Sequence, residues 1–294
     1  MRETYFSRLH PAVCFGFLVS AICMAVVIQH PAYLLASVLA ALCMNITLSG
    51  RRAVKNFARI LPLWALISAV NPILNLRGER VLFEYLGRPY TLEALCYGMV
   101  RAGMFAAMLA RMAVYNAVLT EDRFSYLFAA LAPSMALLLT TVLRMIPNLL
   151  RRAKQILVAR RCVGLGGEGD VCERLNSGLN ALSVLTSWAL EGSVVTADSM
   201  NSRGYGPGRR SCYHNYRMDR SALCVSIALA ALLVCALIAL LHGGGAANYT
   251  PEMAIAPVKG ENGWGLAAYA LFLLLPTFLN LKEELQWIIS RSRI

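Results

Sequence analysis

Two short stretches, ILVARRCVGLGG and SMNSRGYGPG, each end a helix-like run with arginine and glycine. Glycine favours the left-handed backbone that closes a helix, so both stretches predict a helix end. An arginine there can grip a carboxylate of another protein through two parallel hydrogen bonds. Each end alone also fits an ordinary cap, because a basic last turn interacts favourably with the helix dipole. The candidate docking residues are Ala159, Arg160, Arg161, Ser202, Arg203 and Gly204.

No set of residues in the sequence predicts catalysis or cofactor binding. Gly164, Gly166 and Gly169 match GxGxxG, but a helix rather than a strand precedes them, which argues against a dinucleotide-binding turn. None of the four lysines lies in a GxxxxGK(S/T) loop, so any ATP would be bound by partner subunits. The nine cysteines include no CxxC pair, and the four histidines form no ligand cluster. We therefore expect neither an enzyme nor a metal or cofactor site.

The composition predicts a membrane protein. Of the 294 residues, 58% are hydrophobic and 15% are charged, whereas a soluble domain is about 25% charged. Helices of roughly 18 or more apolar residues can cross a hydrocarbon core about 30 Å thick. Six runs have about that length: 12–29, 32–49, 60–76, 94–119, 222–241 and 264–281. The predicted fold is an all-α polytopic membrane protein with about six transmembrane helices and a cytoplasmic helical hairpin.

The formal net charge of +12 is spread unevenly along the chain. Arginine and lysine concentrate before the first apolar run, after the second, and between the fourth and fifth. Because short loops rich in these residues stay in the cytoplasm, these segments and both termini are predicted to be cytoplasmic. The positive charge is therefore assigned to membrane topology, and no nucleic-acid partner is expected.

The charge pattern divides the chain into three regions. Residues 1–119 carry four predicted spans, residues 222–294 carry two, and the basic segment 120–221 lies between them. We expect the spans to form one bundle and the basic segment to lie on its cytoplasmic side.

Within segment 120–221 the sequence predicts a helical hairpin. Pro133 separates a short helix from a longer amphipathic one that ends near Arg160, and a third helix covers 172–202. The stretch SMALLLTTVLRMIP is apolar enough to be mistaken for a span, but Arg144 and Pro147 interrupt it. A seventh crossing would also move a basic cluster outside. We expect this helix to start against the membrane bundle and to end in the cytoplasm.

At these residues the sequence resembles the transmembrane T component of energy-coupling factor (ECF) transporters, the CbiQ-like family. Members carry two cytoplasmic coupling helices, each closing on an Ala-Arg-Gly type motif. The corresponding positions are Ala159-Arg160-Arg161 and Ser202-Arg203-Gly204, and Arg160 is favoured over Arg161 as the first docking arginine. Weaker likenesses are LHP at 9–11, SAVNPILN, and LLLTTVLRMIPNLLRRAKQILVARR, and the match is weakest over 211–294.

The resemblance implies a T subunit in the cell membrane of a prokaryote. In that family the T protein joins two ABC-type ATPases, which bind the ATP, to a substrate-binding S component that imports a vitamin or a transition metal. Its partners would thus be two ATPases, an S component and membrane lipid. The two arginine-tipped helices would sit in grooves of the ATPases and pass on their movement.

Three further residues lie where a polar group or a proline is unusual in a span. Arg111 is deep in the fourth run, where it could pack inside the bundle or contact the S component. Asn71 and Pro72 lie in the third run, where a kink is the simplest interpretation. The alternative function is a self-contained secondary transporter or channel without ATPase partners. It would need polar residues at the midplane and ideally an inverted repeat, and only Asn45, Asn71 and Arg111 are candidates.

Overall fold

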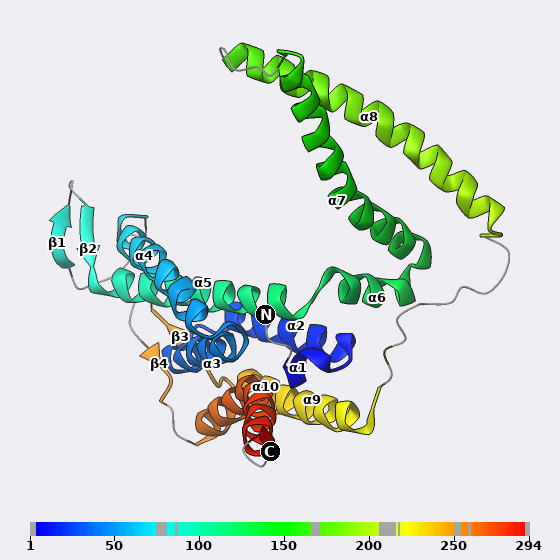
Figure 1. The fold of residues 1–294 in the computed structure, drawn as a ribbon. Coiled ribbons are helices and arrows are strands. Elements are labelled where there is room, and N and C mark those ends of the chain that lie inside the picture. The colour runs from blue at the N-terminus through cyan, green and yellow to red at the C-terminus, as the bar shows by residue number, and fades with distance from the viewer. Residues whose placement is uncertain are drawn as a thin grey trace. The chain divides into compact units, whose positions relative to one another are not determined.

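The chain divides into two compact units. The computed structural model describes residues 4–74, 81–85, 88–165, 171–205, 216, 218–249, 254–257 and 260–291. Unit 1 comprises Met1–Thr120 and Tyr216–Ile294, and unit 2 comprises Glu121–Asn215 (Figure 1). Unit 2 thus falls inside the basic segment 120–221 that the sequence set apart.

Unit 1 is a bundle of helices with two small β-hairpins, so the fold class is all-α. Its helices are α1 (Tyr5–Arg8), α2 (Pro11–Val27), α3 (Pro31–Ser49), α4 (Arg51–Leu74), α5 (Leu92–Val118), α9 (Arg220–Leu241) and α10 (Glu261–Arg291). The antiparallel hairpins pair β1 (Val81–Tyr85) with β2 (Arg88–Thr91) and β3 (Ala247–Asn248) with β4 (Ala254–Ile255). The sequence did not predict either hairpin.

Six helices of the described chain are long and apolar enough to cross a membrane. They are Pro31–Ser49, Ala53–Leu74, Leu92–Val118, Pro133–Cys162, Arg220–Leu241 and Asn262–Arg291. This set differs from the predicted one in two places. Helix α2 has 17 residues and falls just short of the others, whereas α7 (Pro133–Cys162), which the charge pattern had set aside, has the length and composition of a span.

Helices α2 and α3 begin with the same His-Pro motif, in which the histidine side chain caps the helix. The ring Nδ1 of His10 accepts the N–H of Ala12 at 3.2 Å, and that of His30 accepts the N–H of Ala32 at 3.2 Å. The proline that follows each histidine costs the helix no backbone hydrogen bond, since the first N–H groups of a helix have no partner within it. At the other end of α3, Gly50 takes a φ of +56° and α4 begins at the next residue. The basic residues after Gly50 therefore start a helix instead of filling a loop.

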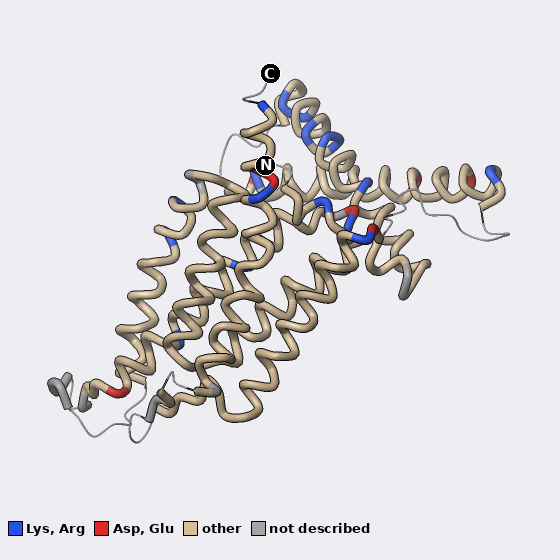
Figure 2. The backbone as a smooth tube through the Cα atoms, turned by 90° about the horizontal axis from the view of Figure 1, so that it is seen from below, with Lys and Arg blue, Asp and Glu red and all other residues tan. Residues whose placement is uncertain are grey.

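The core of unit 1 forms around α5 and α10. Helix α5 packs against α2, α3 and α4, while α10 packs against α9, α3 and α1. A chain of aromatic rings joins the start of the bundle to α10, with centroids 5.4 Å apart for Phe6 and Phe17 and 5.1 Å apart for Phe17 and Phe272. Figure 2 shows few charged residues along the middle of these helices and places the segments near both termini at one end of the bundle. Helix α1 and the end of α10 therefore lie on the same side of unit 1.

The β3–β4 hairpin is tied to the opposite end of the bundle, where α2 meets α3. The hydroxyl of Tyr249 donates to the carbonyl of Gln29 at 3.1 Å, and Nε2 of His30 lies 3.0 Å from the carbonyl oxygen of Ala256. Burial raises the pKa of the Tyr249 hydroxyl, which remains a hydrogen-bond donor at neutral pH. These bonds hold the connection between α9 and α10 against the bundle.

Unit 2 consists of α6 (Glu121–Leu131), α7 and α8 (Val171–Ser202). Pro133 separates α6 from α7 as predicted, and α8 agrees with the expected 172–202 to one residue. Helix α7 continues through Arg144 and Pro147, which interrupt its apolar run but not the helix. The end of α7 contacts the start of α8, and the two helices separate away from that tip (Figure 1).

Candidate functional site

The two arginine-containing helix ends close with the same cap. At the end of α7, Gly164 has a φ of +79°, its N–H donates to the Arg161 carbonyl at 3.0 Å, and the N–H of Leu165 donates to the Arg160 carbonyl at 2.9 Å. This pair of bonds is the Schellman motif, which needs a left-handed residue and therefore favours glycine. The predicted glycine stop is confirmed at this end.

The end of α8 repeats the motif. Gly204 has a φ of +75°, its N–H donates to the Asn201 carbonyl at 3.0 Å, and the N–H of Tyr205 donates to the Met200 carbonyl at 3.1 Å. Four further glycines of the two stretches, at positions 166, 167, 206 and 208, lie outside the described residues, as does position 169. Gly164 and Gly204 alone account for both helix ends.

The arginines do not hold equivalent positions in the two caps. Arg203 directly precedes the left-handed Gly204, whereas Arg160 and Arg161 lie four and three residues before Gly164. In the first cap, Val163 occupies the place of Arg203. Compared with Arg203, Arg160 is therefore three residues, nearly one turn of helix, further from its glycine, and Arg161 is two residues further.

Arg160 and Arg161 also differ in their surroundings. Arg160 is half-buried, and its Nε donates to Oγ of Ser177 at 3.4 Å. Ser177 is buried and donates to the Leu165 carbonyl at 3.3 Å, which ties the start of α8 to the end of α7. Arg161 and Arg203 are exposed and bond to no other side chain in the described part of the chain. Arg160, the favoured docking residue, thus links the end of α7 to the start of α8, whereas the side chain of Arg161 is exposed to solvent.

A second contact braces the hairpin away from its tip. The guanidinium carbon of Arg152 on α7 lies 4.1 Å from the centre of the Trp188 ring on α8. A cation over an indole face contributes about 0.5–1 kcal/mol at exposed sites. Together with the Arg160–Ser177 bond, this contact links α7 to α8 at two places along the hairpin.

The two caps are far apart along the hairpin. The cap of α7 contacts Ser177 near the start of α8, and the other cap follows Ser202 at its end. At 1.5 Å per residue, α8 separates the two caps by roughly 40 Å. Between them α8 exposes eight large apolar side chains, and such surfaces commonly mark contacts with other proteins. These residues are Val171, Leu175, Leu179, Leu182, Val184, Leu190, Val194 and Val195.

Arg111 lies inside the bundle. It is 3% exposed, and its Nη2 donates to the carbonyl of Ser37 at 3.3 Å and to Oγ of Ser37 at 3.2 Å. Its Nε has no partner, and it forms no ion pair within the described residues. Of the two roles that the sequence allows, this geometry suits packing between α3 and α5.

Asn71 and Pro72 lie near the end of α4, three and two residues before Leu74, not in the middle of a span. Pro72 has no N–H for the carbonyl of Ser68, four residues earlier. That carbonyl lies against Gly98 of α5, where an added Cβ would be 2.9 Å from the oxygen. The proline therefore coincides with a close crossing of α4 and α5.

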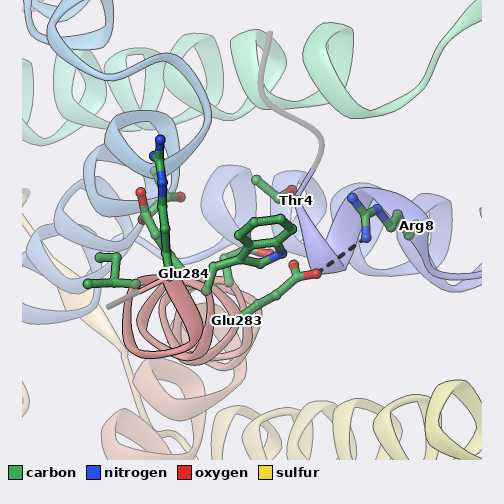
Figure 3. Close-up of a pocket in the computed structure, with 9 residues that line it drawn as sticks. Thr4, Arg8, Glu283 and Glu284 are labelled. Carbon is green, nitrogen blue, oxygen red and sulfur yellow. Dashed lines mark hydrogen bonds and ion pairs between the residues drawn. The ribbon is translucent and has the colours of Figure 1, made fainter. Parts of the chain in front are cut away.

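Sequence reasoning missed a pocket at the end of unit 1 that carries both terminal segments (Figure 3). It measures about 510 Å³ and brings Thr4 and Arg8 together with Asn280, Glu283 and Glu284 of α10. The nearest signal in the sequence is the pair of acids directly after the last apolar run. Nothing in that pair indicates that residues some 270 positions earlier would face it.

A comparison with protein-family models gave no match, and a search of curated protein sequences gave none either. Function must therefore be inferred from the residues and their geometry.

Proposed function

We propose that the chain is the transmembrane T subunit of an ECF-type importer. It would couple ATP hydrolysis by two ABC-type ATPases to the reorientation of a substrate-binding S component that carries a vitamin or a transition metal. Its membrane would be the cell membrane of a prokaryote, with both termini in the cytoplasm. The chain would contribute no catalytic group and bind no nucleotide.

The observation that carries this proposal is the pair of arginine-bearing caps, one at the end of α7 and one at the end of α8. They share one Schellman geometry, lie roughly 40 Å apart, and belong to a unit distinct from the helix bundle. One cap would engage each ATPase, since two separate subunits need two separate contacts. The exposed apolar side chains of α8 would provide a surface for the S component.

The mechanics follow from the stiffness of a helix and the shape of a guanidinium. Arginine fixes direction as well as charge when it forms two hydrogen bonds with a carboxylate, whereas lysine offers a single ammonium. A displacement of the ATPase groove would therefore be passed to the helix that ends in it. The Arg152–Trp188 and Arg160–Ser177 contacts would carry part of that displacement from one arm to the other.

Affinity purification of the tagged protein from mild detergent tests the proposal. Two ATPases should accompany the wild type, and Arg161→Glu or Arg203→Glu should reduce their recovery about tenfold or more, because each variant opposes like charges. Arg203→Lys should give an intermediate loss. Lys154→Glu, an equal charge change at an exposed position of α7, serves as the control. Equal ATPase recovery from wild type and all variants would show that the caps are ordinary helix ends.

The alternative is a self-contained secondary transporter, for which the buried Arg111 is the one specific observation. Its guanidinium already bonds to Ser37 and lines neither the cavity of about 510 Å³ nor that of about 320 Å³. Transport by the purified chain in vesicles without ATP would favour this alternative and contradict the T-subunit proposal.

A further inference from the structure

We propose that the pocket formed by the two terminal segments binds a zwitterionic glycerophospholipid with a primary amine, of the phosphatidylethanolamine kind. The headgroup occupies the polar pocket, and one acyl chain lies in an apolar groove beside it. This inference rests on the membrane insertion proposed above, but it does not depend on ATPase docking.

The polar pocket contains both signs of charge. Besides Thr4 and Arg8, it is lined by Thr47 at the end of α3 and by the last three turns of α10, including Glu283, Glu284 and Arg291. Nη1 of Arg8 lies 3.4 Å from Oε1 of Glu283, and both side chains remain partly exposed. Its volume of about 510 Å³ is that of a site for a small ligand.

An apolar groove lies beside the polar pocket. A second cavity of about 320 Å³ lies between α3 and α10 and shares Thr47 with the first. Its walls are almost entirely hydrocarbon, formed by Cys43, Ile46, Leu274, Phe278 and Leu281 together with Thr277. A polar pocket and an apolar groove that share a lining residue fit an amphiphile better than a water-soluble metabolite.

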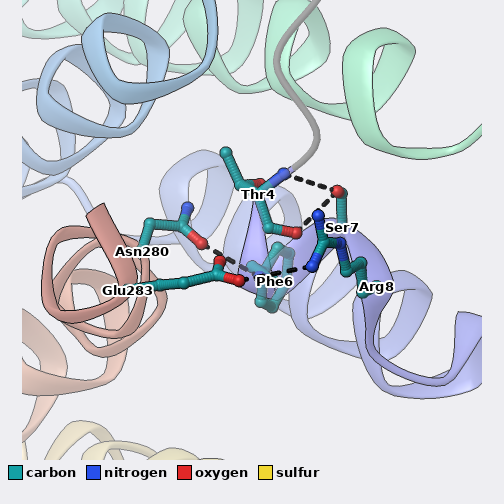
Figure 4. Close-up of polar contacts among 6 residues, drawn as sticks. All are labelled: Thr4, Phe6, Ser7, Arg8, Asn280 and Glu283. Carbon is teal, nitrogen blue, oxygen red and sulfur yellow. Dashed lines mark hydrogen bonds and ion pairs between the residues drawn. The ribbon is translucent and has the colours of Figure 1, made fainter. Parts of the chain in front are cut away.

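Three buried polar atoms around these cavities have no partner among the described residues. They are Oγ1 of Thr4, Oγ1 of Thr277 and Nδ2 of Asn280. The amide of Asn280 is oriented by its other atom, because Oδ1 accepts the N–H of Phe6 at 2.9 Å (Figure 4). Buried polar groups rarely lack a partner, and all three of these can donate a hydrogen bond. They favour a ligand rich in acceptor oxygens, as the phosphate and ester groups of a lipid are.

The residues of α10 follow the layers of a bilayer. On α10 the apolar groove is lined by Leu274, Thr277, Phe278 and Leu281, Asn280 lines the polar pocket, and Glu283 to Arg291 form the charged end of that pocket. The rise from Thr277 to Glu283 is about 9 Å, close to the depth of about 5–8 Å that separates the hydrocarbon edge from the headgroup surface. Ester oxygens would thus meet Thr277 and Asn280 while the headgroup meets the charges.

The charges of the pocket select the headgroup. A phosphate suits Arg8 and Arg291, and a primary ammonium can donate up to three hydrogen bonds to Glu283 and Glu284. An anionic headgroup without an amine would place its charge beside the two carboxylates. A quaternary ammonium carries the charge but has no N–H to donate.

Native mass spectrometry of the full chain, titrated with phosphatidylethanolamine, phosphatidylglycerol or phosphatidylcholine of identical acyl chains, tests the proposal. One phosphatidylethanolamine should be retained at least fivefold more strongly than the other two. The double substitution Glu283→Gln with Glu284→Gln should weaken that retention about tenfold, since charge-assisted hydrogen bonds are lost. Lys282→Gln, on the same helix but outside the pocket lining, should leave it unchanged.

A second variant tests the groove without touching the headgroup site. Cys43→Trp fills the apolar cavity from an exposed position of α3 and should also weaken retention. Equal retention of all three lipids by the wild type, or a preference for phosphatidylglycerol, would overturn the proposal even if a variant failed to fold. Because the assay contains no ATPase, a failed ATPase purification would leave this result standing.

Discussion

Arg111 is a charged side chain that is almost fully buried and has no carboxylate partner within the described chain. Its guanidinium has five N–H groups, and Ser37 alone supplies the two contacts that the structure gives it. Removing a charge from water is costly, and each lost hydrogen bond adds to that cost. The stability of the α3–α5 contact should therefore depend strongly on Ser37, because its oxygens bond to Arg111, although its side chain is small.

Ser37→Ala should lower the free energy of unfolding by about 1–3 kcal/mol, because it removes an acceptor from a buried charged donor. Thermal unfolding of the detergent-purified protein measures the change. Ser20→Ala is the matched control, since that hydroxyl bonds only to carbonyls of its own helix. In an Arg111→Met background, Ser37→Ala should cost much less, and an equal cost in both backgrounds would contradict the buried-charge explanation.

At the scale of elements, the helices of unit 1 approach closely where glycine leaves room. An added Cβ at Gly98 would lie 2.7 Å from Cβ of Asn71, and one at Gly265 would lie 2.5 Å from Cβ of Ala239. Small residues play this part in membrane helices, where van der Waals packing replaces the hydrophobic effect as the force between helices. The α4–α5 and α9–α10 contacts thus each include a position that admits no side chain.

Gly98→Ala should destabilise the bundle by about 1–3 kcal/mol, because Asn71 and the backbone of Ser68 must move aside. Thermal unfolding again provides the measurement. Gly16→Ala on α2 is the control, since an added methyl group there meets nothing within 4 Å. Alanine is a better helix former than glycine, so the control should be neutral or slightly stabilising. Equal behaviour of the two variants would mean that α4 and α5 pack less tightly than described.

The sequence predicted helix ends well where glycine or proline marks them and poorly elsewhere. Gly164 and Gly204 set the ends of α7 and α8 through their backbone conformation, which the residue type reveals. Hydropathy instead marks the part of a helix that suits a membrane. The run 264–281 therefore predicted a helix that in fact continues through charged residues to Arg291. The pocket residues could not be grouped from the sequence, because the contact between Phe6 and Asn280 spans 274 positions.

At the scale of the whole molecule, the placement of α7 decides the membrane topology. This helix has the length and composition of a span, whereas the distribution of basic residues predicts that its end lies in the cytoplasm. The two arrangements place Cys162, the last residue of α7, on opposite sides of the membrane. Cys162 is exposed and free, so its labelling distinguishes them.

We expect a charged, membrane-impermeant maleimide to label a variant that retains only Cys162 in inverted vesicles and not in right-side-out ones. The same cysteine-free background with Ala246→Cys, an exposed position between α9 and β3, should show the reverse pattern. Labelling of Cys162 from the outside would make α7 a crossing helix and would remove its cap from the ATPases.

The hydrogen bond between Phe6 and Asn280 also sets an order of assembly. Its partners are 274 residues apart, so the first segment of the chain waits for α10 before it can be fixed. At about 5–20 residues per second, that delay during translation is roughly 15–55 s. Unit 2 emerges and can fold in the interval, while α1 remains without its contact to α10. The bundle is thus completed late, and the end of unit 1 that contains the Phe6–Asn280 bond is the last part to fold.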